Sequence, residues 1–275
     1  MKPLLRSMTW PEVNDAAQAR RVLVLPVAAI EQHGHHLPVD TDNLNVIHIA
    51  EQAATRHPET LVAAPPIHYG YNEHNMDFPG TVSVRMEHLL DFYYDVGESY
   101  ARMGFERLIL LNGHGSNAPI AELAARRLTV HTSALAAAIN WWDLIVDELH
   151  RLCQMDQRAV DHACEWETSA YLHIRPELVQ MERAVDERAI ECGGPAWMYS
   201  QIGMPTPVRF MNWWSKFSAS GVNGLPSLAT AEKGKAMVEA AIARLTAIAA
   251  EFRAAPDLPR RDLRANQRVS VRPTT

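Results

Sequence analysis

Side chains that can bind a metal cation are concentrated between residues 31 and 42. The stretch reads Glu-Gln-His-Gly-His-His-Leu-Pro-Val-Asp-Thr-Asp. Carboxylates and imidazoles in one loop would be costly to bury as bare charges, so a bound cation is their natural partner. The mixture of nitrogen and oxygen ligands suits zinc, manganese or iron better than magnesium or calcium. The stretch therefore predicts a site for transition-type divalent cations.

Two further segments carry ligand-type residues downstream. Arg107 to Asn112 is strand-like and ends in Gly113-His114-Gly115-Ser116-Asn117, and the third segment runs from Asp161 to Ser169. The first stretch also follows a strand-like run, from Arg21 to Ile30. In open α/β sheets the carboxyl ends of the strands form the ligand-binding edge. We expect the segments to meet at that edge.

Five residues make up the predicted ligand set. Glu31 and His33 are two apart, so on an extended strand end they share a face. Asp42 opens the next helix, where the helix dipole favours a carboxylate, and its two oxygens can bridge two cations. His114 lies between glycines that let the backbone turn tightly. Glu167 begins a predicted helix and completes the set.

Several neighbours leave alternatives open. Asp40 replaces Asp42 if the register of the loop shifts by one turn. His35 or His36 is a candidate for orienting a ligand without binding the metal. Glu165 is either catalytic or a solvated helix residue, and Glu167 has a catalytic role as well as a metal-binding one.

His162 is the candidate proton donor, because an imidazole can titrate near neutrality; the alternative is a capping role. Cys164 invites a cysteine-nucleophile hypothesis. His162 and Cys164 are only two residues apart at a helix start, a spacing at which side chains do not face each other, so thiol catalysis is disfavoured. The predicted substrate-binding residues are His74, Ser116, Trp141, Trp142 and Trp213.

The alternation of strands and helices predicts an α/β fold with a mostly parallel sheet. The expected strands are Val22 to Ile30, Thr60 to Ile67, Arg107 to Asn112 and Ala134 to Trp141. The expected helices are Asn43 to Arg56, Met86 to Gly104, Ala118 to Val130, Glu165 to Ile174, and Thr230 to Arg253, with Thr230 as N-cap. Residues 1–255 are expected to form one domain, and residues 256–275 either a C-terminal arm or a disordered tail.

Composition excludes some partners. The net charge of −6 gives no reason to expect nucleic acid or an anionic membrane as a partner. No apolar run approaches the ~20 residues of a membrane span, and the N-terminus lacks the apolar core of a signal peptide. Cys153, Cys164 and Cys192 are odd in number and match no zinc-binding spacing, which favours a reduced, cytoplasmic setting.

These motifs together resemble the creatininase (creatinine amidohydrolase) family, from Trp10 to about Phe252. Further matching pieces are Phe78-Pro79-Gly80-Thr81, Gly221-Val222-Asn223-Gly224 and Ala229-Thr230-Ala231-Glu232-Lys233-Gly234. The resemblance implies a single-domain, three-layer α/β/α fold, a homo-oligomer (a hexamer), and two divalent metal ions, zinc or manganese with iron as a third choice. Its ligand set carries over onto Glu31, His33, Asp42 and His114, and its spacing favours Asp42 over Asp40.

One position departs from the family pattern. Creatininase itself has a ligand glutamate two residues after the histidine that corresponds to His114, and this chain has Ser116 there. Other family members take the last carboxylate from a Glu-Thr-Ser segment, which implies Glu167 in this chain.

The leading function is a binuclear metal-dependent hydrolase whose activated water cleaves a carbon–nitrogen bond of a small cyclic or linear amide. The alternative is ring opening of a keto-cyclitol or keto-sugar, or trimming of a peptide precursor, at the same site. A sugar-like substrate needs more hydrogen-bonding groups, which Asn72, Asn140, Asn212 and Asn223 could supply. A metal-binding protein without catalysis is the third hypothesis, and the open, glycine-rich turns argue against it.

The segment from Glu191 to Pro226 is predicted to be irregular, to close the pocket and to contact another subunit. It is rich in large apolar residues, which are enriched at interfaces: Trp197, Met198, Tyr199, Phe210, Met211, Trp213, Trp214 and Phe217.

Overall fold

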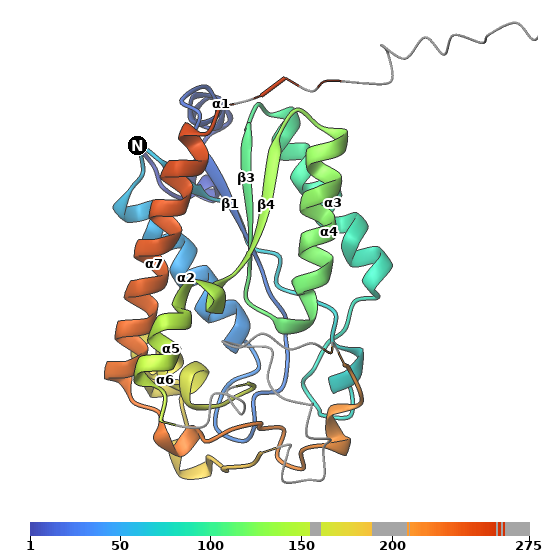
Figure 1. The fold of residues 1–275 in the computed structure, drawn as a ribbon, viewed down its shortest axis with the longest axis vertical. Coiled ribbons are helices and arrows are strands. Elements are labelled where there is room, and N and C mark those ends of the chain that lie inside the picture. Colours follow the sequence, from blue (N-terminus) through green and yellow to red (C-terminus); the bar gives the residue numbers. More distant parts are fainter. Residues whose placement is uncertain (155–160, 189–207, 209, 257, 260, 262–275) are drawn as a thin grey trace, which may run out of the picture.

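The structure is a computed structural model that describes residues 1–154, 161–188, 208, 210–256, 258, 259 and 261. A four-stranded parallel sheet forms the middle layer, in the order β2-β1-β3-β4. Helices cover both faces of this sheet (Figure 1). The predicted α/β fold with a parallel sheet is confirmed.

The strands are β1 (Val22–Val27), β2 (Leu61–Ala63), β3 (Arg107–Asn112) and β4 (Leu135–Asn140). The two central strands, β1 and β3, are buried along their whole length. They pair in register from Leu23 opposite Leu108 to Val27 opposite Asn112, so both end at the same level of the sheet. The loops that follow them therefore start side by side.

Three strands are shorter than the sequence predicts: β4 lacks one predicted residue at each end, and β1 and β2 each end at least three residues early. β1 ends at Val27 rather than Ile30 because the chain leaves the sheet, and the Glu31 amide donates to the Val39 carbonyl instead. β2 ends at Ala63 rather than Ile67. Pro65 and Pro66 follow closely, and proline has no amide hydrogen to donate to a strand ladder.

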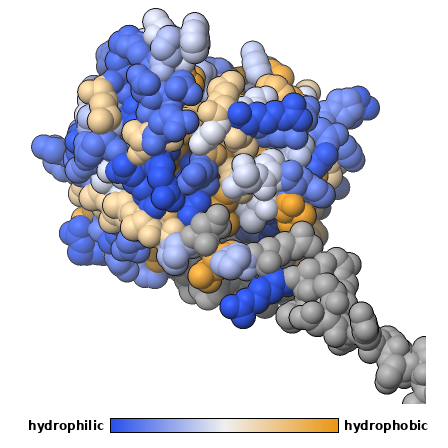
Figure 2. Space-filling view, turned by 90° about the horizontal axis from the view of Figure 1, so that it is seen from above, coloured by the Kyte–Doolittle hydropathy of each residue, from blue (hydrophilic) through white to orange (hydrophobic). Residues whose placement is uncertain are grey.

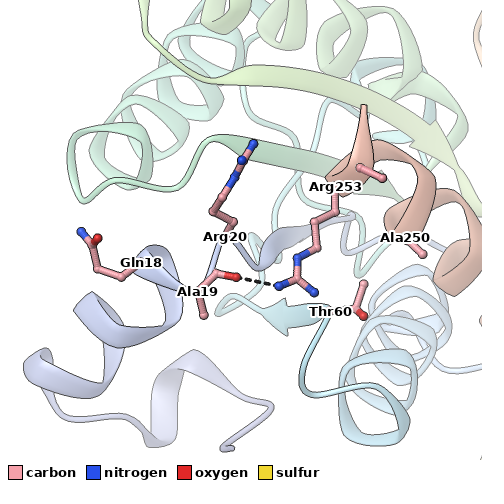
Figure 3. A pocket seen from close by; sticks show the side chains of 7 residues that line it. Gln18, Ala19, Arg20, Thr60, Ala250 and Arg253 are labelled. Atoms are coloured by element: carbon pink, nitrogen blue, oxygen red, sulfur yellow. Dashed lines mark hydrogen bonds between the residues drawn. The ribbon is translucent and has the colours of Figure 1, made fainter. Parts of the chain in front are cut away.

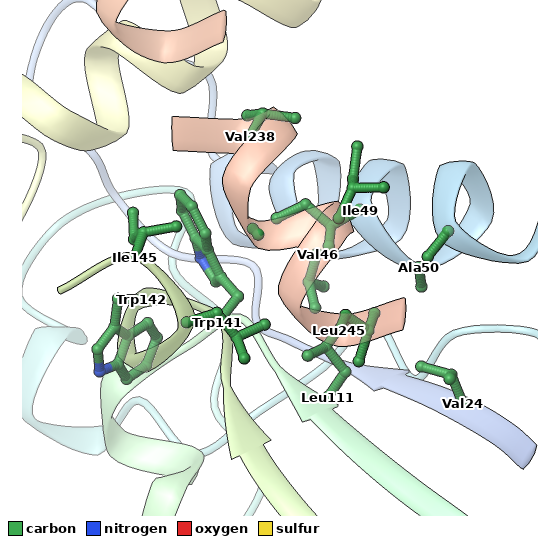
Figure 4. Close-up of a cluster of buried hydrophobic side chains, with 14 of the residues drawn as sticks. Val24, Val46, Ile49, Ala50, Leu111, Trp141, Trp142, Ile145, Val238 and Leu245 are labelled. Carbon is green, nitrogen blue, oxygen red and sulfur yellow. The ribbon is translucent and has the colours of Figure 1, made fainter. Parts of the chain in front are cut away.

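One layer of helices contains α2 (Thr41–Arg56), α5 (Val146–Leu152), α6 (Glu165–Ile174) and α7 (Ala231–Ala254). Alternate residues of the central strands, including Val24 and Leu111, pack against α2 and α7 (Figure 4). The other strand residues, including Leu25 and Leu110, face the opposite layer. That layer holds α3 (Met86–Arg102) and α4 (Ala118–His131), with α1 (Trp10–Gln18) near the amino ends of the strands. Burial on both faces explains why β1 and β3 are almost continuously apolar.

The predicted helices are found within two residues of their expected ends, and Thr230 caps α7 by accepting from the Lys233 amide at 3.3 Å. The helices α1 and α5 were not predicted. The start of α1 carries a sequence signal, a capping box in which Thr9 and Glu12 exchange hydrogen bonds. Residues 191–207, 209, 262–275 and two others of the predicted arm lie outside the described residues, so Trp197, Met198 and Tyr199 do as well.

The end of the molecule that carries α1 is mostly hydrophilic, with apolar residues interspersed (Figure 2). Within the described residues, no helix is both long and apolar enough to cross a membrane. The chemistry-bearing residues gather at the opposite end, where the strands finish.

Helices α6 and α7 approach each other closely at Gly234. A Cβ atom at this position would lie 1.8 Å from the Ser169 carbonyl oxygen, which belongs to the backbone and cannot turn aside. This contact fixes α6, and with it Glu167, against the long α7 helix.

We predict that Gly234→Ala lowers the free energy of unfolding by about 1–3 kcal/mol, because overpacking outweighs the better helix propensity of alanine. Gly115→Ala is the matched control, since nothing lies within 4 Å of a Cβ atom there. Urea unfolding of the two variants measures the difference. Equal stabilities of the two variants would contradict the packing argument.

Candidate metal centre

Among the described residues, three groups of side chains could hold a cation. One combines Glu31, His33 and the half-buried His162, and the other two, called the ligand groups below, are buried throughout and share Asp42. Glu31, Asp42 and His114 make the first, and His33, Asp42 and Glu167 make the second. In each group, one ligand atom from every residue lies within 4.8 Å of the others. Asp42 belongs to both and turns one oxygen to each: Oδ2 is 3.1 Å from His114 Nδ1, and Oδ1 is 3.3 Å from His33 Nε2.

The charge balance of this cluster fits bound cations. Three carboxylates and two imidazoles are nearly excluded from solvent. Burial opposes the charged form of His33 and His114, but the neighbouring carboxylates outweigh it and raise both pKa values well above the ordinary range. Among the described residues, His33 Nε2 and Asp42 Oδ2 complete no hydrogen bond. Without a cation, these carboxylates depend on protonated imidazoles to balance their charge, and two potential ligand atoms make no hydrogen bond. Both properties are those of a cation-binding site.

His114 is oriented by backbone and side-chain contacts. Its Nε2 lies 3.0 Å from the Tyr71 carbonyl oxygen. A carbonyl only accepts, so Nε2 carries a proton, and Nδ1, 2.8 Å from Glu31, is the nitrogen left to face the carboxylates and to bind a cation once it is deprotonated. Asn112 also holds the turn, accepting from the His114 amide and donating to its carbonyl at 3.1 and 2.7 Å.

Gly113 permits the close approach of this turn to α2. A Cβ atom there would lie 2.6 Å from the Asp42 carbonyl oxygen. The glycine before His114 therefore lets the end of β3 meet the first turn of α2, which brings Asp42 to His114.

His33 has the same kind of support. Its Nδ1 lies 3.1 Å from the Glu31 carbonyl oxygen, so Nδ1 carries the proton and Nε2 is left to face Asp42 and Glu167. Both imidazoles are thus held by backbone carbonyls in the tautomer that presents a lone pair to the cluster.

Glu167 comes from the first turn of α6. Its Oε2 accepts from the Ala163 amide, while Oε1 lies 3.8 Å from His33 Nε2. Ala163 has φ +52°, an uncommon conformation for a residue with a Cβ atom. His36 Nε2 lies 2.9 Å from the hydroxyl of Thr168, so His36 braces the residue next to Glu167.

His162 lies against the cluster from the other side. Its ring centroid is 4.4 Å from that of His33, and its Nε2 is 2.8 Å from the Gln32 carbonyl oxygen. Nε2 therefore carries the proton of the neutral ring. Burial, with the nearby His33, lowers the His162 pKa to about 4. Asn223 holds the segment by donating its amide to the His162 carbonyl at 2.9 Å and its side chain to Asp161 at 2.7 Å.

The structure separates the alternatives around the cluster. Asp40 accepts from the Tyr171 hydroxyl at 2.9 Å and belongs to neither ligand group. His35 is exposed. Glu165 is not a solvated helix residue: it is fully buried and pairs with Lys233 at 2.6 Å. Cys164 is buried in the apolar core, and burial raises its thiol pKa well above the ordinary value.

The predictions for the tryptophans need correction. Trp141 and Trp142 are 1% and 6% exposed and pack against Trp166 in the core, with ring centroids 4.8 and 6.2 Å from it (Figure 4). They stabilise the layer behind α6 instead of lining a pocket. Trp213 is 40% exposed, whereas its neighbour Trp214 contacts His162 at a centroid distance of 5.3 Å.

Sequence reasoning missed the amides that support the cluster. Gln32 accepts from His162 through its backbone carbonyl, Asn75 donates to Glu31, and Asn112 accepts from the His114 amide. Each stands within two residues of a recognised histidine or carboxylate, and that proximity was the available signal. His74 and Ser116 do come together, with the Ser116 hydroxyl 3.3 Å from His74 Nε2.

A concavity of about 440 Å³ lies at the amino ends of β1 and β2 (Figure 3). Its Arg253 donates to the Ala19 and Glu59 carbonyls at 2.7 and 3.0 Å, and Arg20 pairs with Glu106 at 3.0 Å. These guanidinium groups already have protein partners, so the concavity joins the ends of α1 and α7 and is remote from the cluster.

A parallel α/β sheet with a carboxylate–histidine cluster at the carboxyl ends of its strands is an arrangement typical of metal-dependent hydrolases. The profile of the creatininase family, described as creatinine amidohydrolase, matches residues 6–249. The chain belongs to the creatininase family and is a hydrolase of that family.

Named relatives show how diverse the family is. The 3-dehydro-scyllo-inosose hydrolase of Thermotoga maritima is 31% identical over 253 residues, covering 86% of this chain and 78% of that protein. The creatinine amidohydrolase of Pseudomonas putida is 31% identical over 195 residues, covering 65% and 74%. A mycofactocin precursor peptide peptidase of Mycolicibacterium smegmatis is 30% identical over 218 residues, covering 78% of each.

Solved structures agree with the fold. A creatininase crystal structure superposes with a TM-score of 0.75 at 29% identity, covering 91% of this chain and 98% of that chain. A manganese form of creatininase and a zinc–zinc form of a creatininase mutant also give TM-scores of 0.75, at 28% and 27% identity, each covering 92% of this chain and 99% of that chain.

Proposed function

We propose that this chain is a binuclear metal-dependent hydrolase that uses two divalent cations, zinc or manganese with iron as a third choice. The observation that carries the proposal is the shared carboxylate: Asp42 turns one oxygen to each of two ligand groups. Glu31 and His114 would hold one cation with Asp42, and His33 and Glu167 would hold the other. The zinc–zinc and manganese forms of structural relatives support this use of metals.

Two such ions, held by the five ligand residues, would supply Lewis-acid polarisation of a substrate carbonyl and a lowered pKa for a bound water molecule. The residues of the chain do the remaining work. The Tyr71 and Glu31 carbonyls keep the two imidazoles in their ligating tautomers. The Ala163 amide holds one oxygen of Glu167 and leaves the other towards His33.

His162 is the proton carrier in this proposal. Its Nε2 donates to the Gln32 carbonyl, so Nδ1 holds the lone pair of the neutral ring. The neutral imidazole would first accept a proton at Nδ1 from the attacking water molecule and then deliver it to the leaving nitrogen, so the role is base followed by acid. Glu167 is a ligand in this scheme, and its contacts with His33 and Ala163 leave it no separate proton-transfer role.

Cleavage of a carbon–nitrogen bond in a small amide remains the leading proposal for the reaction. Ring opening of a keto-cyclitol is the alternative, favoured by the long match to the inosose hydrolase. Two of the four asparagines expected to recognise a sugar have their side chains engaged within the protein: Asn140 bonds to Asp143 at 2.9 Å, and Asn223 to Asp161 at 2.7 Å. This engagement favours a substrate with few hydroxyl groups.

The homo-oligomer, a hexamer, also remains a proposal. Phe210, Met211 and Trp213 are 42%, 52% and 40% exposed in the described part of the irregular segment. Large apolar groups in one exposed segment are typical of a surface that another subunit covers.

Metal binding tests the shared carboxylate. Asp42→Ala should lose both ions, because each ligand group contains Asp42, whereas His33→Ala should lose mainly one. We expect about two metals per wild-type chain, measured by elemental analysis after chelation and reloading with Mn²⁺ or Zn²⁺. Asp40→Ala is the matched control and should keep both. Wild-type metal content in Asp42→Ala would contradict the proposal.

A substrate panel tests the reaction class. Creatinine, a small lactam, a formamide, 3-dehydro-scyllo-inosose and a short peptide are incubated with metal-loaded protein, and hydrolysis is followed by mass spectrometry. We expect turnover of an amide and its loss on chelation. Turnover of the inosose alone would replace the leading reaction with ring opening, and turnover that survives chelation would refute metal-dependent hydrolysis.

His162→Asn should lower kcat by about 10²–10⁴, the usual contribution of a proton-transfer group, with metal content unchanged. His35→Asn is the control, because His35 is exposed. Steady-state kinetics and elemental analysis are made on the same preparations. A kcat within a factor of about two of the wild-type value would exclude the proton-carrier role.

A further inference from the structure

The segment from Tyr71 to Asn75 contacts two members of the first ligand group, His114 and Glu31. The Tyr71 carbonyl orients His114, and the Asn75 side chain donates to Glu31. His74 lies between these two contacts, in the short 3-10 helix η2 (Glu73–Asn75), and is 9% exposed. Its side chain is thus fixed beside the cluster, and it belongs to neither ligand group.

The hydrogen bonds around His74 define its tautomer. The Glu31 carboxylate can only accept, so the Asn75 atom that bonds it is the amide nitrogen, Nδ2. His74 Nε2 lies 3.1 Å from this Asn75 nitrogen and 3.3 Å from the Ser116 hydroxyl oxygen. Nε2 therefore accepts, and the proton of the neutral ring is on Nδ1. Burial lowers the His74 pKa to about 4, which keeps the ring neutral at physiological pH.

His74 Nδ1 has no hydrogen-bond partner among the described residues. A buried N–H donor without an acceptor destabilises a folded protein, and such groups are rare unless a ligand or water completes them. The supporting contacts, in contrast, are complete: Nε2 has two partners from separate segments of the chain. The ring is held firmly with its unbonded donor pointing away from that support.

The surroundings of this donor indicate what would accept from it. The Trp214 ring packs edge-on against His74, with centroids 6.4 Å apart, and the same indole contacts His162 at 5.3 Å. Trp214 lies in the 3-10 helix η9 (Trp214–Lys216), which packs on η2. A group that bonds to Nδ1 would lie near Trp214, whose ring contacts both histidines. An indole beside an N–H donor suits a flat group with a carbonyl oxygen.

We propose that the Nδ1–H group of His74 binds a carbonyl or similar acceptor oxygen of the substrate and so selects for substrates that carry one. This rests on the proposed hydrolase function and adds a specificity-determining residue to it. Ser116 acts through His74: its hydroxyl helps to keep Nε2 as the acceptor. The position where creatininase has a ligand glutamate is then used here to orient a substrate-binding imidazole.

Three variants separate the two ring nitrogens. The amide of asparagine ends at the level of Nδ1, and that of glutamine at the level of Nε2. His74→Asn keeps a donor at the proposed contact, His74→Gln moves it, and His74→Leu removes it. Creatinine and 3-dehydro-scyllo-inosose serve as probes, each with a carbonyl oxygen, and binding is measured by calorimetry with the metal-loaded protein.

We expect His74→Gln and His74→Leu to weaken binding of a probe about tenfold, the factor that one neutral hydrogen bond contributes. His74→Asn should stay within about threefold of the wild type, and metal content should be unchanged in all three. For a probe that is hydrolysed, KM should rise more than kcat falls. A Ser116→Ala variant should show a smaller loss in the same direction.

Equal binding by His74→Gln and the wild type would overturn the inference, and so would a wild-type protein that binds neither probe. Loss of metal in His74→Gln would also overturn it, because His74 would then support the ligands. Turnover with unchanged binding by His74→Gln leaves the hydrolase proposal standing and removes this one. If binding depends on His74 but neither probe is hydrolysed, the inference about His74 stands and the hydrolase proposal is removed.

Discussion

The burial of three carboxylates in one place is the constraint on which this structure depends. Glu31, Asp42 and Glu167 are almost fully removed from water, and His33 and His114 are the imidazoles that pair with them among the described residues. Carboxylates in such surroundings are costly unless positive charge compensates them. The two imidazoles supply part of that charge when protonated, as the raised pKa values of His33 and His114 indicate. Two divalent cations would supply it more completely.

The fold meets this constraint by bringing separate segments to one edge of the sheet. Strands β1 and β3 end at the same level of the sheet, which places the loops with Glu31 and His114 side by side. Gly113 lets the first turn of α2 approach, which adds Asp42, and the contact of Gly234 with Ser169 fixes α6, which adds Glu167. Backbone carbonyls then set both imidazole tautomers. These contacts place the ligands without relying on flexible side chains.

The sequence was sufficient where the signal was local or came from several motifs together. Helices α2 and α6 and strand β3 follow from apolar runs bounded by polar turns. The five ligand-type residues do meet in the structure. The tryptophans were less predictable. Whether Trp141 faces a pocket or the core depends on Trp166, which is distant in the sequence and packs against it. Trp213 and Trp214 are adjacent, so only the local backbone decides which of them reaches His162.

Supporting contacts were the least predictable part of the site. Asn75 and Gln32 are ordinary polar residues in the sequence, and their roles arise from contacts with residues 44 and 130 positions away. The same holds for Ser116, whose hydroxyl meets His74 across 42 positions. Pairs of this kind depend on how loops fold over the sheet edge, which neither propensity nor periodicity specifies.

The central claim is that Asp42 bridges two cations. X-ray diffraction from crystals of the manganese- or zinc-loaded protein, recorded at the absorption edge of the metal, tests it directly. The account predicts two anomalous peaks about 3.5–4 Å apart, one beside Glu31 and His114 and the other beside His33 and Glu167, with one Asp42 oxygen on each. A single peak, or two peaks with Asp42 bound to neither, would contradict it.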